Sequence, residues 1–140
     1  MGLALGLRLW GITWQLPWRL HPDEVNYVEY GLTSAAERDF SSQYTNQPPL
    51  FRHLLTIEYL ALDRLGLLGG PLESAETILQ GDRPESHPTL SRAYAAGRVT
   101  SAILGAANVL VLLLTVRDLL GMPAGLLSAL LLSASFAHVT

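Results

Sequence analysis

One stretch of this chain restricts its possible folds more than any other. Between Ala93 and Val116 only Arg98 is charged, and from Ile103 onward the run is apolar apart from one asparagine and one threonine. A helix needs roughly 20 mostly apolar residues to cross the hydrocarbon core of a membrane, which is about 30 Å thick. The sequence therefore predicts a transmembrane helix over residues 92–116, and with it an integral membrane protein.

Both ends of the chain are also apolar. Residues 123–140 carry no charged side chain, and the segment 1–18 carries only Arg8. Arg8 lies inside its apolar stretch and no Ala-x-Ala-like site follows, which disfavours a signal peptide. The tryptophans of this segment are typical of an interfacial aromatic belt: Trp10, Trp14 and Trp18. We therefore expect partial transmembrane helices over 1–18 and 123–140, in an N-terminal fragment of a larger multi-pass protein.

The composition excludes several classes of protein. Cysteine is absent, so the chain has neither a disulfide framework nor a thiolate metal site. All nine basic residues are arginine, and twelve acidic residues give a formal net charge of -3. This acidic balance, without any basic run, argues against a nucleic-acid partner.

The polar segment 19–91 is expected to be a structured loop rather than a disordered one. Over residues 22–38 a proline at the first helical position and acids in the first turn predict a helix. Its apolar side is predicted to carry Val25, Val28, Leu32 and Ala36. Its polar, acid-tipped side is predicted to carry Asp23, Tyr27, Tyr30 and Ser34. This pattern predicts an amphipathic helix that follows the first membrane segment directly.

A second amphipathic helix is predicted over residues 48–66, where a proline pair marks its start. Its apolar stripe consists of Leu50, Leu54, Ile57 and Leu65. Five charged or histidine side chains lie between these positions, which is too many for a lipid-facing span. We therefore expect this helix to lie on the membrane surface.

The fold predicted from these segments is all-α and polytopic. About three transmembrane helices, the first and last truncated, enclose a long outer loop with juxtamembrane helices. A short turn at 117–122 joins the last two membrane segments, and its Arg117 favours the cytoplasmic side under the positive-inside rule. The loop 19–91 is then extracytoplasmic.

Asp23 and Glu24 are the strongest candidates for chemistry. A general preference for acids in the first turn of a helix explains them without any function, because they offset the helix macrodipole. Their predicted position at the outer membrane boundary supports a functional reading. A carboxylate there can deprotonate an acceptor hydroxyl or amine, or help to hold a divalent cation.

Arg98 can also be interpreted in two ways. It can extend its guanidinium to the lipid headgroups, as arginines near helix ends do. Alternatively, its planar fork can bind a phosphate. His53 and His87 lack the spacing of a metal site, so we interpret them as solvated surface histidines.

The order of several short motifs resembles a known family. Arg8 precedes "HPDE", which contains Asp23 and Glu24, and the tyrosine-bearing helix with Tyr27. Then follow "QPPLF" at 47–51, "AAGRVTSAILG" at 95–105 and "VRDLLGMPAGLLSALLLSAS" at 116–135. Nearly the whole chain is similar to the N-terminal part of the multi-spanning GT-C-type glycosyltransferases. The nearest resemblance is to dolichyl-phosphate-mannose protein mannosyltransferases and bacterial aminoarabinose transferases.

This resemblance implies an enzyme that moves a sugar from a polyprenyl-phosphate carrier to an extracytoplasmic acceptor, either a protein or a glycolipid. It implies a catalytic role for Asp23 with Glu24 as its partner, and substrate binding by Tyr27 and Arg98. Arg98 would meet the carrier phosphate. It also implies a multi-pass membrane protein, with the bacterial plasma membrane favoured over the endoplasmic reticulum. The fragment alone is expected to be inactive, since later helices of the family complete the catalytic cavity.

The cofactor remains open at this point. Some relatives place a metal-binding glutamate just before the proline pair, where this chain has Asn46 and Gln47, so a divalent metal is neither implied nor excluded. A competing function is a non-enzymatic membrane protein, such as a transporter segment or assembly subunit that uses the outer loop to contact a partner. Transporter sites usually lie near the bilayer midplane on broken helices. The candidate chemistry here lies at the predicted outer edge, which favours the enzyme.

Overall fold

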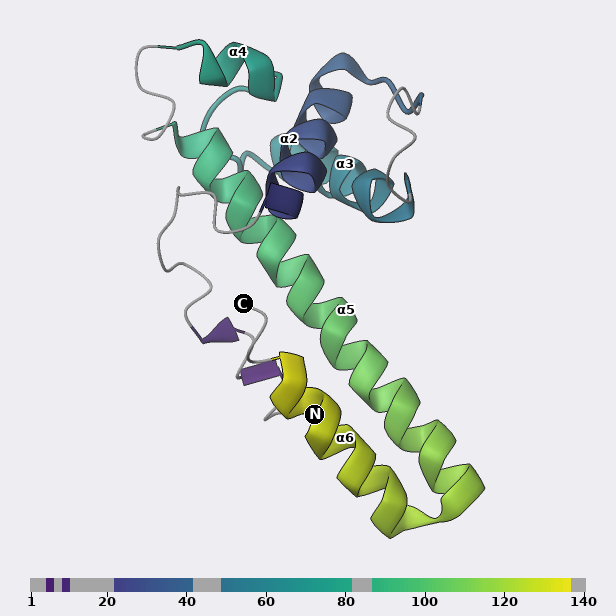
Figure 1. Ribbon diagram of the computed structural model, residues 1–140. Helices are drawn as coiled ribbons and strands as arrows, with labels where there is room; N and C mark the ends of the chain where they lie inside the picture. Colours follow the sequence, from purple (N-terminus) through teal and green to yellow (C-terminus); the bar gives the residue numbers. More distant parts are fainter. Residues whose placement is uncertain (1–4, 7–8, 11–21, 42–48, 82–86, 137–140) are drawn as a thin grey trace. The chain divides into compact units, whose positions relative to one another are not determined.

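The computed structural model describes residues 5–6, 9–10, 22–41, 49–81 and 87–136. Within these ranges the longer elements are all α-helices and no strand occurs, so the all-α prediction is confirmed for this part of the chain. The helices are α2 (Pro22–Glu37), α3 (Pro49–Arg64), α4 (Ala75–Leu79), α5 (Pro88–Leu120) and α6 (Met122–Phe136) (Figure 1). The helix expected over 1–18 lies largely outside the described residues.

The chain divides into two compact units. One comprises residues 13–97, and the other comprises residues 1–12 together with 98–140. Helix α5 contributes its first ten residues to the former and its remainder to the latter.

Helix α5 is longer than the sequence pattern predicted. It runs for 33 residues from Pro88 to Leu120, whereas the expected span was 92–116. Proline is well suited to a first helical position, because the backbone N–H that it lacks would have no helical partner there. Among the described residues, α5 is the one helix both long and apolar enough to cross a membrane. Only 17% of its most apolar stretch is buried, unlike the core helix of a soluble domain.

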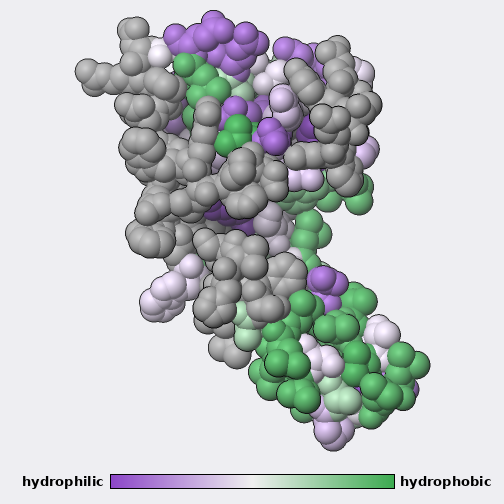
Figure 2. All heavy atoms as spheres, viewed as in Figure 1, coloured by the Kyte–Doolittle hydropathy of each residue, from purple (hydrophilic) through white to green (hydrophobic). Residues whose placement is uncertain are grey.

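The unit containing residues 98–140 is a helical hairpin. Helix α5 ends at Leu120 and α6 begins at Met122, so the expected turn over 117–122 reduces to Gly121. Val109 and Ala129 are buried between the two helices. Most other large apolar side chains of the hairpin are exposed, and Figure 2 shows them gathered over α5 and α6. With 15 residues, α6 is shorter than the roughly 20 that a span requires.

The unit of residues 13–97 packs α2, α3, α4 and the start of α5 around one apolar core (Figure 1). Helices α2 and α3 approach closely at Gly31, where an added Cβ would lie 3.1 Å from Leu55 Cβ. The short helix α4 is fixed to α2, because the Ala75 N–H donates to Thr33 Oγ1 at 3.2 Å. The buried apolar residues of this core are Val28, Leu32, Ala35, Leu55, Tyr59, Ala75, Ile78, Leu90, Ala93 and Tyr94.

Helix α3 buries the side opposite to its apolar stripe. The stripe residues Leu50, Leu54 and Ile57 are all exposed, as is Leu65 directly after the end of α3. The buried residues are instead Arg52, Leu55, Thr56 and Tyr59. Packing within the unit therefore leaves the stripe available to another apolar environment.

Helices α2 and α3 end in the same Schellman motif with different residues. At the end of α2 the Asp39 N–H donates to the Ser34 carbonyl at 3.1 Å, and Arg38 adopts φ +54°. At the end of α3 the Leu67 N–H donates to the Leu62 carbonyl at 2.8 Å, and Gly66 adopts φ +67°. A left-handed conformation costs a residue with a Cβ about 1–2 kcal/mol, whereas glycine adopts it freely. Arg38 is therefore strained where Gly66 is not.

We predict that Arg38→Gly raises the free energy of unfolding by about 1 kcal/mol, because glycine relieves the left-handed strain at the end of α2. Gly66→Ala is the matched control and should lower it by a similar amount, since an added Cβ there meets nothing within 4 Å and only the backbone is strained. Denaturant unfolding followed by circular dichroism measures both. Destabilisation by Arg38→Gly would contradict the strain at this position.

Candidate functional site

The candidate acids lie at the beginning of α2. Asp23 is its second residue and Glu24 its third, directly after Pro22. The side chain of Asp23 lies outside the part of the chain that the structure describes. Glu24 is half-buried. The sequence-based expectation that both acids occupy the first turn of a helix agrees with the bounds of α2.

Tyr59 of α3 is the buried centre of the unit to which these acids belong. Its side chain is fully buried, and its hydroxyl donates to the Ala93 carbonyl of α5 at 3.1 Å. Two glycines make room for the ring: a Cβ on Gly31 would lie 3.3 Å from Tyr59 Cε2, and one on Gly97 would lie 3.4 Å from the hydroxyl. Helices α2, α3 and α5 therefore meet at this one side chain.

The surroundings of Tyr59 keep it in its neutral form. Burial raises the pKa of Tyr59 well above its usual range, and the charges of Glu58 and Glu24 act in the same direction. Tyr59 is thus a fixed neutral donor rather than a base or nucleophile.

A second hydrogen bond joins α2 to α5. The Tyr94 hydroxyl donates to Glu29 Oε1 at 2.9 Å, across 65 positions of sequence. On the same helix pair, a Cβ added to Gly97 would lie 3.1 Å from Val28 Cγ2. Together these contacts fix α2 along the first turns of α5, the helix that is long and apolar enough to span a membrane.

The other two predicted site residues have different surroundings. The Tyr27 ring is half-buried and packs edge-on against Phe51 of α3, with 5.2 Å between ring centroids. Tyr27 therefore contributes to the contact between α2 and α3 and is not confined to a polar face. Arg98 is half-buried in α5, ten residues beyond Pro88. It begins the other compact unit, so it is not part of the geometry described for Glu24 and Tyr27.

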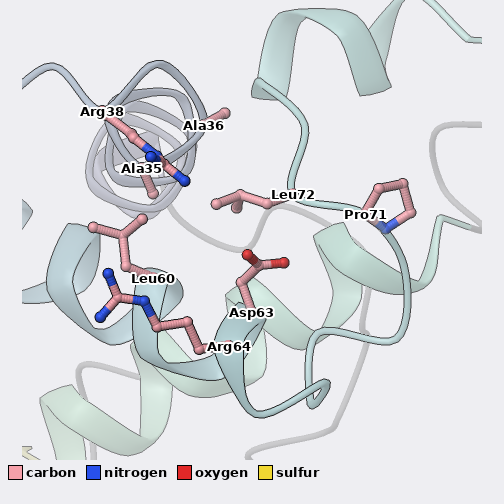
Figure 3. Close-up of a pocket in the computed structure, with 8 residues that line it drawn as sticks. All are labelled: Ala35, Ala36, Arg38, Leu60, Asp63, Arg64, Pro71 and Leu72. Atoms are coloured by element: carbon pink, nitrogen blue, oxygen red, sulfur yellow. The ribbon is translucent and has the colours of Figure 1, made fainter.

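A hollow of about 320 Å³ lies at the opposite end of α2 from the acids. It is lined by Ala35, Ala36, Arg38, Leu60, Asp63, Arg64, Pro71 and Leu72 (Figure 3). Figure 3 shows the Asp63 carboxylate and the Arg38 guanidinium directed into the space between α2, α3 and Leu72. The lining combines two basic side chains and one acidic side chain with apolar ones, so the hollow has no clear preference for one class of ligand.

No metal centre can be assembled from the described residues. They contain no group of three or more histidine, aspartate or glutamate side chains placed to hold an ion. Asn46 and Gln47 lie outside the described ranges.

No protein-family model, curated protein or solved structure matches this chain. The resemblance to the GT-C-type glycosyltransferases consequently remains a prediction from the order of the motifs.

Sequence reasoning missed three residues that define this site: Tyr59, Glu29 and Tyr94. Tyr59 lies on the side of α3 opposite to the leucine stripe. The stripe pattern therefore predicts an exposed position for Tyr59. The pairing of Glu29 with Tyr94 depends on two helices meeting in space, which spacing along the chain does not reveal. The glycines Gly31 and Gly97 were an available signal, since small residues allow helices to approach closely.

We predict that Tyr59→Phe lowers the free energy of unfolding by about 1 kcal/mol near neutral pH, because one net hydrogen bond is lost. The difference from wild type should shrink at alkaline pH. A tyrosine with a raised folded-state pKa contributes stability that is present below its unfolded pKa of about 10 and is lost as pH rises toward the folded pKa. The wild type should therefore lose up to about 1.4 kcal/mol per pH unit from this group above about pH 10.

Denaturant unfolding of both proteins between about pH 8 and about pH 11 measures this effect. The other four tyrosines are present in both proteins, so their contributions cancel in the comparison. Equal pH slopes for wild type and Tyr59→Phe would show that Tyr59 ionises normally and is not held neutral.

Proposed function

We propose that this chain is the N-terminal part of an integral membrane glycosyltransferase, which transfers a sugar from a polyprenyl-phosphate carrier to an extracytoplasmic acceptor. The observation that carries the proposal is the order of four motifs: "HPDE", "QPPLF", "AAGRVTSAILG" and "VRDLLGMPAGLLSALLLSAS". The contacts of α2 support it. They attach the acid-bearing helix to the beginning of α5, the candidate membrane span.

In the proposed reaction, an acceptor hydroxyl or amine attacks the anomeric carbon of the carrier-linked sugar. The bond from that carbon to the carrier phosphate oxygen breaks, and the phosphate leaves with the bonding electrons. The Asp23 carboxylate takes the proton of the acceptor or orients the acceptor for attack. Glu24 is its partner, Tyr27 contacts the substrate, and the Arg98 guanidinium offsets the charge that develops on the leaving phosphate.

The membrane is the proposed environment of two further features. The exposed leucines of the α5–α6 hairpin would face lipid, since large exposed apolar surfaces are unusual in soluble monomers. The exposed stripe of α3 would lie at the headgroup boundary, with the buried side of α3 turned to its own unit. The segment 19–91 is proposed to be extracytoplasmic. Arg117 would mark the cytoplasmic turn, where it also forms an ion pair with Asp118 at 2.7 Å.

We predict that Asp23→Asn in the complete protein lowers sugar transfer at least about a hundredfold, because an amide cannot accept the acceptor's proton. Transfer from a lipid-linked sugar donor in membranes measures it. The matched control is Glu37→Gln, which removes an exposed carboxylate from the last residue of the same helix. It should retain wild-type transfer. Full activity of Asp23→Asn would exclude Asp23 from catalysis, whereas the absence of sugar transfer in the wild type would favour the non-enzymatic alternative.

The orientation of α3 can be tested with single cysteines, because the chain has none of its own. We predict that a fluorophore on Ile57→Cys is quenched by lipids with nitroxide labels near the headgroups, since Ile57 belongs to the exposed apolar stripe. The control is Asp63→Cys on the same helix, which is also exposed and should be quenched much less. Equal quenching at both positions would place α3 away from the membrane surface.

A further inference from the structure

Arg52 presents an unusual combination of charge and burial. It lies in the first turn of α3, and only 6% of its surface is exposed. Two of its guanidinium nitrogens, Nε and Nη2, are buried without a hydrogen-bond partner. Arginine remains protonated at all physiological pH values, and it is almost never fully buried unless it is paired. Burying a cation with two unpaired donors costs free energy, so we expect an anion to pair with Arg52.

The neighbouring acid does not supply that anion. The charge of Arg52 contributes to lowering the pKa of Asp39, although Ser41 is the larger cause. Oδ1 of Asp39 accepts from the Ser41 N–H and Oδ2 from its hydroxyl, each at 2.7 Å, and neither oxygen is a hydrogen-bond partner of Arg52 Nε or Nη2. The first turn of α3 contains no acidic residue. Within the described residues, Arg52 Nε and Nη2 therefore stay without an acceptor.

The position of Arg52 in its helix strengthens the need for an anion. The first turn of a helix carries free backbone N–H groups and the positive end of the macrodipole, so a cation is unfavourable there and an oxyanion is favourable. The adjacent His53 adds a buried Nδ1 that also has no partner. Two neighbouring side chains thus leave three polar atoms unsatisfied at one helix end.

The identity of the free nitrogens indicates the shape of the missing group. Nε and Nη2 share one edge of the planar guanidinium. This edge can donate two parallel hydrogen bonds to two oxygens of the same phosphate, a bidentate geometry that lysine cannot reproduce.

We propose that the Arg52 guanidinium, at the N-terminal turn of α3, binds a phosphate group through Nε and Nη2. The phosphate comes from a lipid headgroup or from a soluble phosphate compound. This site goes beyond the proposed function, because it requires neither sugar transfer nor Asp23 and Arg98. It also differs from the hollow lined by Arg38 and Arg64 at the other end of α3.

The test uses the full chain in maltoside micelles, which contain no phosphate, and measures the midpoint of thermal unfolding by circular dichroism. Inorganic phosphate is compared with chloride at equal ionic strength, and phosphatidic acid is compared with diacylglycerol. A ligand that binds only the folded state raises the midpoint, by roughly 3 °C or more near saturation. A rise with phosphatidic acid alone identifies a lipid phosphate as the source. A rise with both ligands identifies a site open to soluble phosphate.

Three variants separate binding from structure. Arg52→Met should abolish the rise, and without ligand its midpoint should equal or exceed that of the wild type, because an unpaired buried charge has been removed. Arg52→Lys should keep a smaller rise, since its ammonium binds without the bidentate fork. The matched control Arg64→Met removes an exposed arginine from the last turn of α3 and should leave the rise unchanged.

Two results overturn the proposal. One is the absence of any rise in the wild type with either phosphate ligand. The other is a rise that Arg52→Met retains, which would assign phosphate binding to other groups. If Arg52→Met fails to fold, Arg52→Lys decides: a rise equal to that of the wild type or no rise at all counts against bidentate binding, and a reduced rise supports it.

Discussion

The fold of residues 13–97 depends on one buried tyrosine placed where three helices cross. Tyr59 has no exposed surface, yet its hydroxyl is satisfied by the Ala93 carbonyl. A buried hydroxyl without a partner would cost more than the hydrogen bond contributes, so the ring and the carbonyl must stay in register. Gly31 and Gly97 permit that register because any larger residue would meet neighbouring atoms at 3.1–3.4 Å. The position of α2, including its acidic first turn, follows from this arrangement.

Helix α3 carries two buried polar side chains, one with a hydrogen-bond partner and one with two unpaired nitrogens. The Tyr59 hydroxyl has its hydrogen-bond partner, and burial raises its pKa and so keeps it neutral. Arg52, seven residues earlier on the same buried side, is charged and leaves two nitrogens unsatisfied. A protein gains nothing in stability from such a cation, since an apolar side chain of similar size would pack at lower cost. The contrast indicates that Tyr59 serves the fold, whereas Arg52 serves an interaction with a group outside it.

Sequence patterns predicted the existence of α2, α3 and α5 better than their packing. Periodicity shows which residues share a side of a helix, and the stripe of α3 from Leu50 to Leu65 was found in this way. Periodicity does not show which side of a helix packs against the rest of the protein. In α3 the unit packs on Leu55 and Tyr59, and the stripe remains exposed. The start of α5 was missed because Leu90 is the one strongly apolar residue from Pro88 to Ser91, so this stretch lacks the apolar signal of a span.

The candidate site was predictable only in part, for the same reason. Asp23 and Glu24 were found because their type and order are visible along the chain. Glu29 was missed, since its importance comes from Tyr94, which is 65 positions away. Arg52 was interpreted as an interruption of an apolar stripe, and its burial becomes evident only when the helices are assembled.

Helix α5 takes part in both compact units of the chain. Its first ten residues accept the contacts of α2 and α3, through the Ala93 carbonyl, the Tyr94 hydroxyl and the Gly97 surface. The following residues are apolar and mostly uncovered, as a helix surrounded by lipid requires. One continuous helix thus serves two surroundings, because its first ten residues pack in the unit of residues 13–97 and the residues that follow are left mostly uncovered. Under the proposed function, the first part of α5 would support the acid-bearing helix and the second part would meet lipid.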